Sequence, residues 1–218
     1  MSSRSKRIIL NITSSILTIL IMFVSFFALV NIIFNIVFIR TNVKGFSMLP
    51  TLNQNVPSEN IDGDIVYINR FSDFSDSDIV VADVDWWTRG YIIKRLVGSP
   101  NDIIQIKDEG DQYSLYVNEE ILYTKEKNSD TNYYYNSIYL TFFEKYPQNT
   151  TTNEAGEKCI KLNENEYLLI GDNWGHSTDC LTGGPAHKDE IIGRVDIIIP
   201  YGENQFRTLV SKMWNLIF

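Results

Sequence analysis

Residues 79–106, IVVADVDWWTRGYIIKRLVGSPNDIIQI, decide the fold of this chain. They contain three short apolar runs, at 79–82, 91–97 and 103–106, that are rich in β-branched residues. Asp, Gly, Pro and Asn separate these runs, a pattern typical of antiparallel strands joined by turns. Similar runs lie before and after this segment, at 64–68, 114–117, 120–123, 159–162, 167–170 and 191–199. We therefore predict a mainly β fold of antiparallel strands in residues 40–123 and 159–200.

The N-terminal part of the sequence predicts a membrane anchor. Residues 8–39 contain no charged side chain, and a helix of about 20 apolar residues already crosses the hydrocarbon core of a bilayer. A cleaved signal peptide has a shorter apolar region, of about 7–15 residues, and ends in a small-x-small cleavage site. Here the run ends in Phe38-Ile39-Arg40, without such a site. We therefore expect residues 8–39 to form a single transmembrane helix that is not removed.

The charges around the anchor suggest its orientation. Three basic residues precede it and two follow it closely, namely Arg4, Lys6, Arg7, Arg40 and Lys44. The positive-inside rule then favours, by a small margin, a single-pass cell-membrane protein with residues 1–7 in the cytoplasm and the remainder extracellular. Residues 41–218 contain 15 basic and 27 acidic residues, a formal charge of −12. That charge is opposite to the basic surface of nucleic-acid-binding proteins, so we expect no nucleic-acid partner.

Two segments depart from the strand pattern. Residues 124–158 are polar and rich in Asn, Thr and Tyr, which predicts a surface insertion. Residues 201–218 predict an amphipathic helix, because apolar side chains follow helical spacing at Phe206, Leu209, Val210, Met213, Trp214 and Ile217. That helix would either pack on the domain or lie on a lipid surface.

Several common kinds of site are missing from the sequence. It has no His-Glu-x-x-His, no zinc-site spacing of Cys and His, and no Gly-x-Ser-x-Gly. We therefore expect neither a metal ion nor a cofactor. Cys159 and Cys180 lack the spacing of a disulfide framework, and we interpret them as free thiols, although an extracellular location would permit a disulfide.

Two polar residues are candidates for chemistry. Ser47 lies in the segment 45–52, GFSMLPTL, whose Gly and Pro predict a fixed loop. It follows Arg40 by seven residues, which span at most about 25 Å and so keep it near the membrane surface. Lys94 lies in the apolar run 91–97 and either extends its ammonium to solvent or points inward. An inward lysine loses hydration, which lowers its pKa from about 10.4 towards about 7–8, where it can act as a general base.

Four ordered blocks of sequence carry a family resemblance. They are SMLPTL at 47–52, GDIV at 63–66, KRLVGSPND at 94–102 and GDNWGHSTD at 171–179, and GRV at 193–195 fits the same pattern. Together with the N-terminal anchor they resemble the bacterial type I signal peptidases of peptidase family S26. The resemblance covers roughly residues 8–200. It implies a signal-peptidase-like β domain and a serine endopeptidase that removes signal peptides from secreted precursor proteins.

The resemblance also implies roles for individual residues. Ser47 would be the nucleophile, with its own backbone N–H as an oxyanion donor, and Lys94 would be the base that takes the serine proton. Ser177 would hydrogen-bond Lys94 and fix its rotamer. Asp179 would brace the site by pairing with Arg95.

This chain departs from the family at several positions of the same blocks. Some relatives have a serine at the position of Gly45, whose hydroxyl adds to the oxyanion hole. Many have arginine at the positions of Trp174 and Leu181, so Asp179 lacks one expected partner here. His176 is also unusual.

Apolar residues near these blocks are candidates for contact with substrate or membrane. They are Phe46, Met48, Pro50, Trp86 and Trp87. The two tryptophans either fill the domain core or sit among lipid headgroups, where an apolar ring with a polar N–H is well suited.

Three other functions fit parts of the pattern. A non-proteolytic assembly factor for surface proteins or pili would lack the Ser–Lys pair. A self-cleaving repressor of related fold would carry a DNA-binding domain where this chain has its anchor. A Ser-His-Asp hydrolase would use His176 or His187, but Ser177 cannot easily face the adjacent His176.

Overall fold

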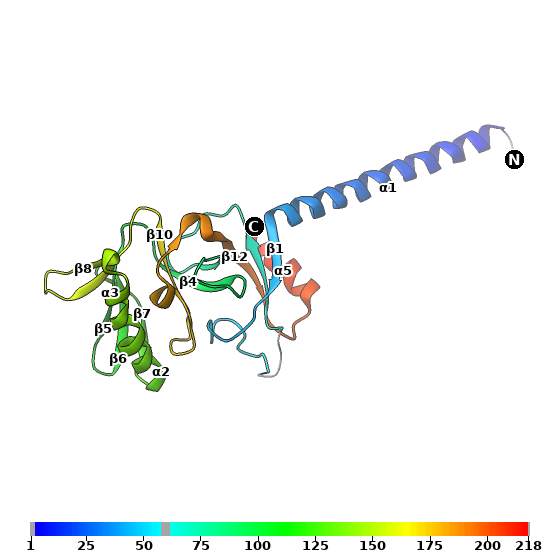
Figure 1. The fold of residues 1–218 in the computed structure, drawn as a ribbon. Helices are drawn as coiled ribbons and strands as arrows, with labels where there is room; N and C mark the ends of the chain where they lie inside the picture. The colour runs from blue at the N-terminus through cyan, green and yellow to red at the C-terminus, as the bar shows by residue number, and fades with distance from the viewer. Residues whose placement is uncertain (1–2, 58–61, 218) are drawn as a thin grey trace. The chain divides into compact units, whose positions relative to one another are not determined.

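The structure is a computed structural model that describes residues 3–57 and 62–217. Figure 1 shows the course of the chain from the N-terminus to the C-terminus. By its internal contacts the chain divides into two units, Met1–Ile39 and Arg40–Phe218.

The first unit is almost entirely one helix, α1 (Ser3–Val37). Its stretch Leu10–Val37 is long and apolar enough to cross a membrane. Polar side chains within it hydrogen-bond back to the helix, as when Thr18 Oγ1 donates to the carbonyl of Ser14. The helix ends at Val37, two residues before the predicted limit of 39, and strand β1 begins at Phe38.

A seven-stranded sheet has the strand order β1-β2-β12-β3-β4-β10-β11. Strand β12 is antiparallel to both β2 and β3, and β4 is antiparallel to both β3 and β10. The strands are β1 (Phe38–Asn42), β2 (Ile65–Asn69), β3 (Ile79–Ala82), β4 (Ile92–Gly98), β10 (Glu166–Ile170), β11 (Ala186–His187) and β12 (Ile191–Ile199). Two short helices, α4 (Cys180–Gly183) and η3 (Lys188–Glu190), lie between β10 and β12 in the chain.

A five-stranded antiparallel sheet has the order β7-β6-β5-β9-β8. Its strands are β5 (Ile103–Asp108), β6 (Gln112–Val117), β7 (Glu120–Glu126), β8 (Thr150–Thr152) and β9 (Lys158–Lys161). The two sheets confirm the prediction of a mainly β, antiparallel fold with one N-terminal apolar helix.

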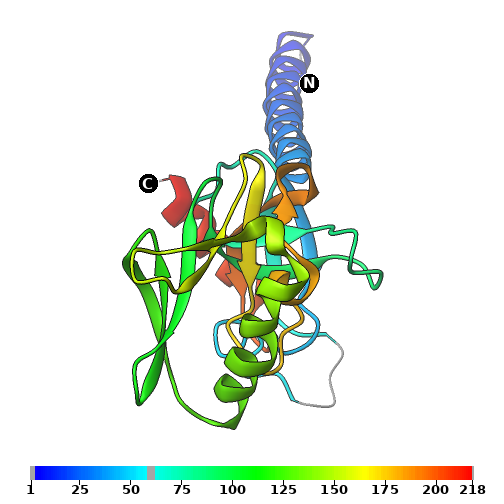
Figure 2. The ribbon, with the colours of Figure 1, turned by 60° about the vertical axis from the view of Figure 1, so that its left-hand side comes forward.

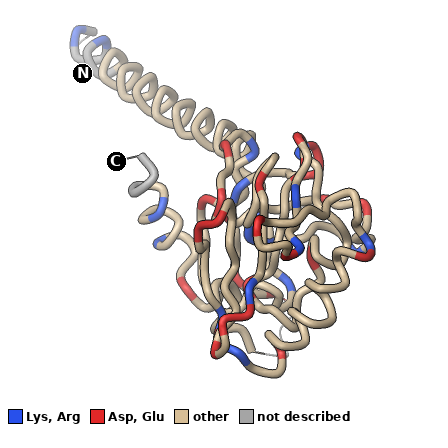
Figure 3. The backbone as a smooth tube through the Cα atoms, turned by 90° about the vertical axis from the view of Figure 1, so that its left-hand side faces the viewer, with Lys and Arg blue, Asp and Glu red and all other residues tan. Residues whose placement is uncertain are grey.

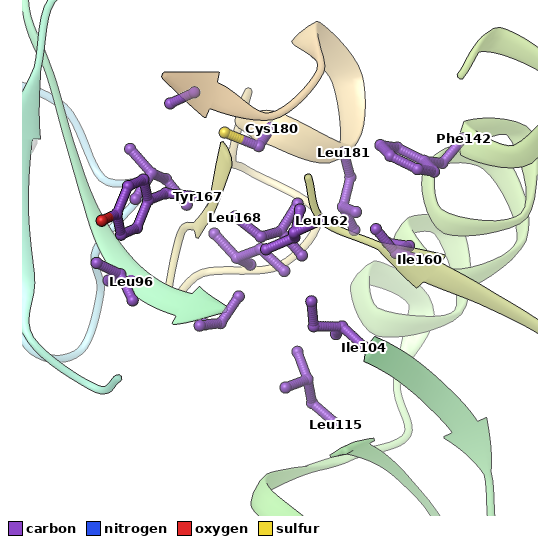
Figure 4. Packing of buried hydrophobic residues seen from close by; sticks show 14 of the residues in the cluster. Leu96, Ile104, Leu115, Phe142, Ile160, Leu162, Tyr167, Leu168, Cys180 and Leu181 are labelled. Carbon is purple, nitrogen blue, oxygen red and sulfur yellow. The ribbon is translucent and has the colours of Figure 1, made fainter. Parts of the chain in front are cut away.

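A hydrophobic core joins the two sheets (Figure 4). Leu96 and Leu168 come from the seven-stranded sheet, and Ile104, Leu115 and Ile160 come from the five-stranded one. All five are 0 % exposed. Burying each such side chain contributes about 1.5–3 kcal/mol, so this core fixes the sheets against each other and gives the site a rigid support.

The prediction of a polar surface insertion at 124–158 is wrong in its central part. Residues 129–149 form four short helices, α2 (Ser129–Tyr133), η1 (Tyr134–Tyr139), α3 (Leu140–Lys145) and η2 (Pro147–Asn149). Tyr134, Tyr139 and Phe142 are at most 2 % exposed and belong to the core. Figure 2 shows these helices beside the strands of the five-stranded sheet, where Tyr135 stacks on Tyr113 of β6.

A π-helix explains why the sequence pattern did not indicate the apolar face of this segment. In η1 the N–H of Leu140 bonds to the carbonyl of Tyr135, five residues back. Residues five apart then share one face, whereas an ordinary α-helix would separate them. Tyr134 and Tyr139 are such a pair, and both are buried.

The C-terminal tail is helical, as predicted, over α5 (Gln205–Ile217). Phe206 and Val210 are exposed, and the helix contacts β12. Acidic and basic residues are spread over the loops and strands of the second unit (Figure 3). Cys159 and Cys180 are both buried free thiols, which confirms their interpretation.

Candidate active site

Ser47 and Lys94 meet in the structure. Ser47 lies in the turn that follows β1, and Lys94 lies on β4. The lysine Nζ donates a hydrogen bond of 2.7 Å to the serine Oγ. Lys94 is only 4 % exposed, so its side chain points inward rather than to solvent.

The alternation of a strand explains this direction. Successive side chains of β4 point to opposite faces of the sheet, so Ile92, Lys94 and Leu96 share the buried face. Lys94 is flanked on that face by two apolar residues and lies opposite Val80 of β3. An ammonium group is thus held in apolar surroundings, with Ser47 as its hydrogen-bond partner.

Burial lowers the pKa of Lys94 below its ordinary value, because apolar surroundings solvate an ammonium poorly. The negative charge of Asp179 is the strongest opposing influence, and Asp172 adds a smaller one. Desolvation is the larger effect, so the neutral amine becomes available at a lower pH than in a free lysine.

The loop 171–179 forms hydrogen bonds with the backbone of Ser47 and Phe46. The backbone N–H of Asn173 donates to the carbonyl of Ser47 at 2.9 Å, and Asn173 Nδ2 donates to the carbonyl of Phe46 at 2.9 Å. A Cβ atom on Gly171 would lie 2.5 Å from the carbonyl oxygen of Ser47 and would overlap Ser177 Oγ. Only glycine at position 171 allows its backbone to approach both Ser47 and Ser177 so closely.

Asp179 is the buried centre of this loop, at 0 % exposure. Its Oδ2 accepts hydrogen bonds from Ser177 Oγ at 2.7 Å, Tyr134 Oη at 2.9 Å and the N–H of Gly171 at 3.1 Å. Its Oδ1 accepts from the N–H of Leu181 at 3.2 Å. Burial raises the pKa of Asp179, and the bond from Ser177 is the strongest influence that opposes this rise.

The expected pairing of Asp179 with Arg95 is wrong. Arg95 forms a bidentate ion pair with Asp172, in which Nε lies 2.7 Å from Oδ1 and Nη2 lies 2.5 Å from Oδ2. Arg95 follows Lys94 in β4 and must therefore point to the opposite face of the strand. The expected bond between Ser177 and Lys94 is not observed within the described residues, where Ser177 Oγ donates to Asp179.

Three residues of this region were not predicted. Asp172 belongs to the block 171–179, and its Oδ2 also accepts a bond from Thr51 Oγ1 at 2.5 Å. Lys125 Nζ donates to the carbonyl of Asp172 at 2.8 Å. Tyr134 reaches Asp179 from the helical segment 129–149. The pairing of Asp172 was foreseeable from strand alternation, but no sequence pattern indicated Lys125 or Tyr134.

A cleft of about 520 Å³ opens beside Ser47 and Lys94. Its lining is mixed: Phe46, Val66, Val81, Trp87, Ile92 and Ile93 are among its apolar residues, and Thr41, Asn42, Lys44, Arg89, His176 and Thr178 are polar. Phe46, one of the predicted contact residues, is 39 % exposed and borders the cleft. Met48 is only 2 % exposed and Pro50 is not part of the lining. The prediction that Met48 contacts substrate or membrane is therefore wrong, because its side chain fills the core.

The two tryptophans have different surroundings. Trp86 packs against α4, where a Cβ atom on Gly183 would overlap its indole ring. Trp87 lines the cleft, and the Arg89 guanidinium lies 5.6 Å from the centre of its ring. Both are partly buried and pack against the core.

The sequence matches the family model for signal peptidase, peptidase S26, over residues 15–200. The chain belongs to this family and is thus a serine endopeptidase by class. It is 28% identical over 162 residues to the signal peptidase I P of Bacillus subtilis subsp. natto, covering 72% of this chain and 74% of that protein. It is 29% identical over 168 residues to a signal peptidase I of Bacillus licheniformis, covering 74% and 76%. A crystal structure of a signal peptidase I from Enterococcus faecalis V583 aligns with a TM-score of 0.34 and 18% identity, over 56% of this chain and 97% of that one.

Proposed function

We propose that this chain removes N-terminal signal peptides from secreted precursor proteins, with Ser47 as nucleophile and Lys94 as general base. Family membership supports signal-peptide removal. The single observation that carries the residue roles is the 2.7 Å hydrogen bond between Lys94 Nζ and Ser47 Oγ in the lining of a cleft. The burial of Lys94 adds to it, since a desolvated lysine can be neutral when it meets the substrate.

The chemistry follows from these positions. The neutral Lys94 amine takes the Ser47 hydroxyl proton while the serine Oγ bonds to the carbonyl carbon of the scissile peptide. The carbonyl oxygen becomes an oxyanion. When the C–N bond breaks, Lys94 returns the proton to the departing amine, which is the new N-terminus of the mature protein. Water then hydrolyses the acyl-enzyme, again with Lys94 as the base, and releases the signal peptide with a free carboxylate.

The backbone N–H of Ser47 is the proposed oxyanion donor. Within the described residues it has no hydrogen-bond acceptor, so it is available to a substrate oxygen. The neighbouring Gly45 has a φ of +80° and open space where a side chain would stand. Gly45 supplies no hydroxyl to the oxyanion.

The substrate and the location complete the proposal. Signal-peptide-bearing precursors are the partners, and membrane lipid surrounds α1, whose apolar length suits a bilayer. The basic residues Arg4, Lys6 and Arg7, which precede the apolar stretch Leu10–Val37, support a cytoplasmic N-terminus and an extracellular second unit. A non-proteolytic assembly role is disfavoured, because both members of the Ser–Lys pair are present and bonded to each other.

The decisive experiment incubates the purified full-length chain with a precursor that bears an Ala-x-Ala site. Product mass identifies the cut. Ser47→Ala and Lys94→Ala should each abolish cleavage, because the two groups act as one unit. Lys127→Ala is the matched control, since it removes a lysine whose ion pair with Asp108 lies outside the cleft lining. Cleavage by Lys94→Ala at a near wild-type rate would disprove the assigned mechanism.

A further inference from the structure

Asp179 is a buried carboxylate with no ion pair from Lys or Arg among the described residues. Arg95 is bound to Asp172. A buried carboxylate without a cation is costly unless hydrogen bonds satisfy it. The groups that satisfy Asp179 are uncharged hydrogen-bond donors, two hydroxyls and two backbone N–H groups.

Tyr134 is one of the donors to Asp179. Its Oη donates to Asp179 Oδ2 at 2.9 Å, and the tyrosine is 0 % exposed. Its ring stacks on Trp174, with centroids 4.9 Å apart and planes at 24°. Burial and the nearby carboxylate raise the pKa of Tyr134 well above its ordinary value, so the phenol keeps its proton and remains a donor.

The helical segment 129–149 packs along the whole loop that contains Asp179. A Cβ atom on Gly175 would lie 2.6 Å from the Cβ of Asp130. His176 Nε2 lies 3.5 Å from Asp130 Oδ2. At the far end, Tyr146 Oη donates to the carbonyl of Thr182 at 3.1 Å. Leu181 also faces Phe142 within the core (Figure 4). Tyr134 therefore belongs to a packed support and is not an isolated contact.

A short chain of contacts connects Tyr134 to the proposed nucleophile. Asp179 Oδ2 accepts from Tyr134, from Ser177 Oγ and from the N–H of Gly171. A Cβ atom on Gly171 would overlap Ser177 and lie 2.5 Å from the carbonyl oxygen of Ser47. These groups leave no free space between them, so a shift of Asp179 would displace the backbone on which Ser47 rests.

We propose that Tyr134 is a positioning residue, whose hydroxyl fixes the Asp179 carboxylate and thereby the loop 171–179 that packs against the backbone of Ser47. This inference rests on the proposed roles of Ser47 and Lys94. It gives the segment 129–149 a function in the site, as the support of the loop 171–183.

Tyr134→Phe in the full-length chain tests the inference, since phenylalanine keeps the ring that stacks on Trp174 and removes only the hydroxyl. In detergent micelles we expect kcat to fall about tenfold, because a hydrogen bond to a charged group is lost, while KM stays the same. The matched control is Tyr139→Phe. Tyr139 comes from the same segment and is equally buried, but its hydroxyl faces the backbone of Ile106 rather than the loop. We expect its kcat to be that of the wild type.

A double mutant shows whether Tyr134 acts through Asp179. The kcat of Tyr134→Phe with Asp179→Asn should equal that of Asp179→Asn alone, because the two changes remove one shared contact. If the fold-losses of kcat in the two single mutants instead multiply in the double mutant, the inference is overturned. An unchanged kcat in Tyr134→Phe would also overturn it. Ser47→Ala is measured beside them. If Ser47→Ala still cleaves, the proposed function fails; if it is inactive while Tyr134→Phe is unimpaired, only the positioning role fails.

A second measurement applies if Tyr134→Phe does not fold. 3-Fluorotyrosine at position 134 keeps the hydroxyl, so kcat should stay near that of the wild type. Its ¹⁹F resonance should move on Asp179→Asn. A resonance that is indifferent to Asp179→Asn would overturn the inference.

Discussion

Arg95 binds Asp172 with two hydrogen bonds, of 2.7 and 2.5 Å, on the face of β4 opposite to Lys94. Asp172 also accepts from Thr51 Oγ1, so one carboxylate joins β4, the loop 171–179 and the turn that contains Ser47. The same loop contains a second buried carboxylate, Asp179, with its own hydrogen-bond cluster. The site is therefore held by two separate carboxylates, of which only Asp172 has an arginine.

Arg95→Ala should lower the free energy of unfolding by about 2–3 kcal/mol, because it leaves the nearly buried Asp172 carboxylate without its cation. Urea unfolding measures the loss. The control is Lys127→Ala, which breaks the more exposed pair with Asp108. That change should cost at most about 1 kcal/mol. Equal losses in the two variants would show that the Arg95–Asp172 pair does not support the fold.

The structure shows which parts of this arrangement were predictable. The strand runs and the ordered blocks around Ser47 and Lys94 were visible, because period-two patterns and short motifs are local. The partner of Arg95 was misassigned, although its neighbour Lys94 already required it to face the other way. Tyr134 could not be found, because a π-helix has no familiar period and its contact with Asp179 joins residues 45 apart in the chain.

Cleavage should increase with pH as Lys94 loses its proton. Its pKa is lowered in the folded protein, so the midpoint of kcat/KM should lie well below about 10.4, the value of a free lysine. A pH–rate profile with a soluble peptide measures it. A midpoint above about 10 would show that Lys94 is not desolvated in solution.

The same pKa shift has a consequence for stability. Between the lowered pKa and that of the unfolded chain, the unfolded state binds more protons, so the stability of the wild type rises with pH across this window. Lys94→Met removes the buried charge. It should be more stable than the wild type at neutral pH, with a difference that shrinks as pH rises through the window. A difference that is constant with pH would contradict this linkage.

Gly171→Ala should impair catalysis far more than stability. The new methyl group would overlap Ser177 and lie 2.5 Å from the carbonyl oxygen of Ser47. A displacement of about 1 Å at a reacting group can lower the rate about a hundredfold. Gly110→Ala is the control, because Gly110 has open space and a positive φ of +89° in an exposed turn. It should lose stability through backbone strain but keep kcat. Full activity in Gly171→Ala would show that the close approach is not required.

The last prediction separates the two tryptophans. Trp86 packs on α4 beside Gly183 and is partly buried, so Trp86→Ala should lower the melting temperature through the cavity that it leaves. Trp87 borders the cleft with Arg89 near its ring. An indole at that edge suits the headgroup layer of a bilayer, where apolar contact would offset the repulsion between an acidic domain and anionic lipid. Trp87→Ala in vesicles should therefore slow cleavage of a membrane-bound precursor several-fold and leave cleavage of a short soluble peptide unchanged. Trp86→Ala serves as the comparison, with both substrates affected alike. If Trp87→Ala slows both substrates equally, or only lowers the melting temperature, Trp87 contacts the peptide or the core and not the lipid.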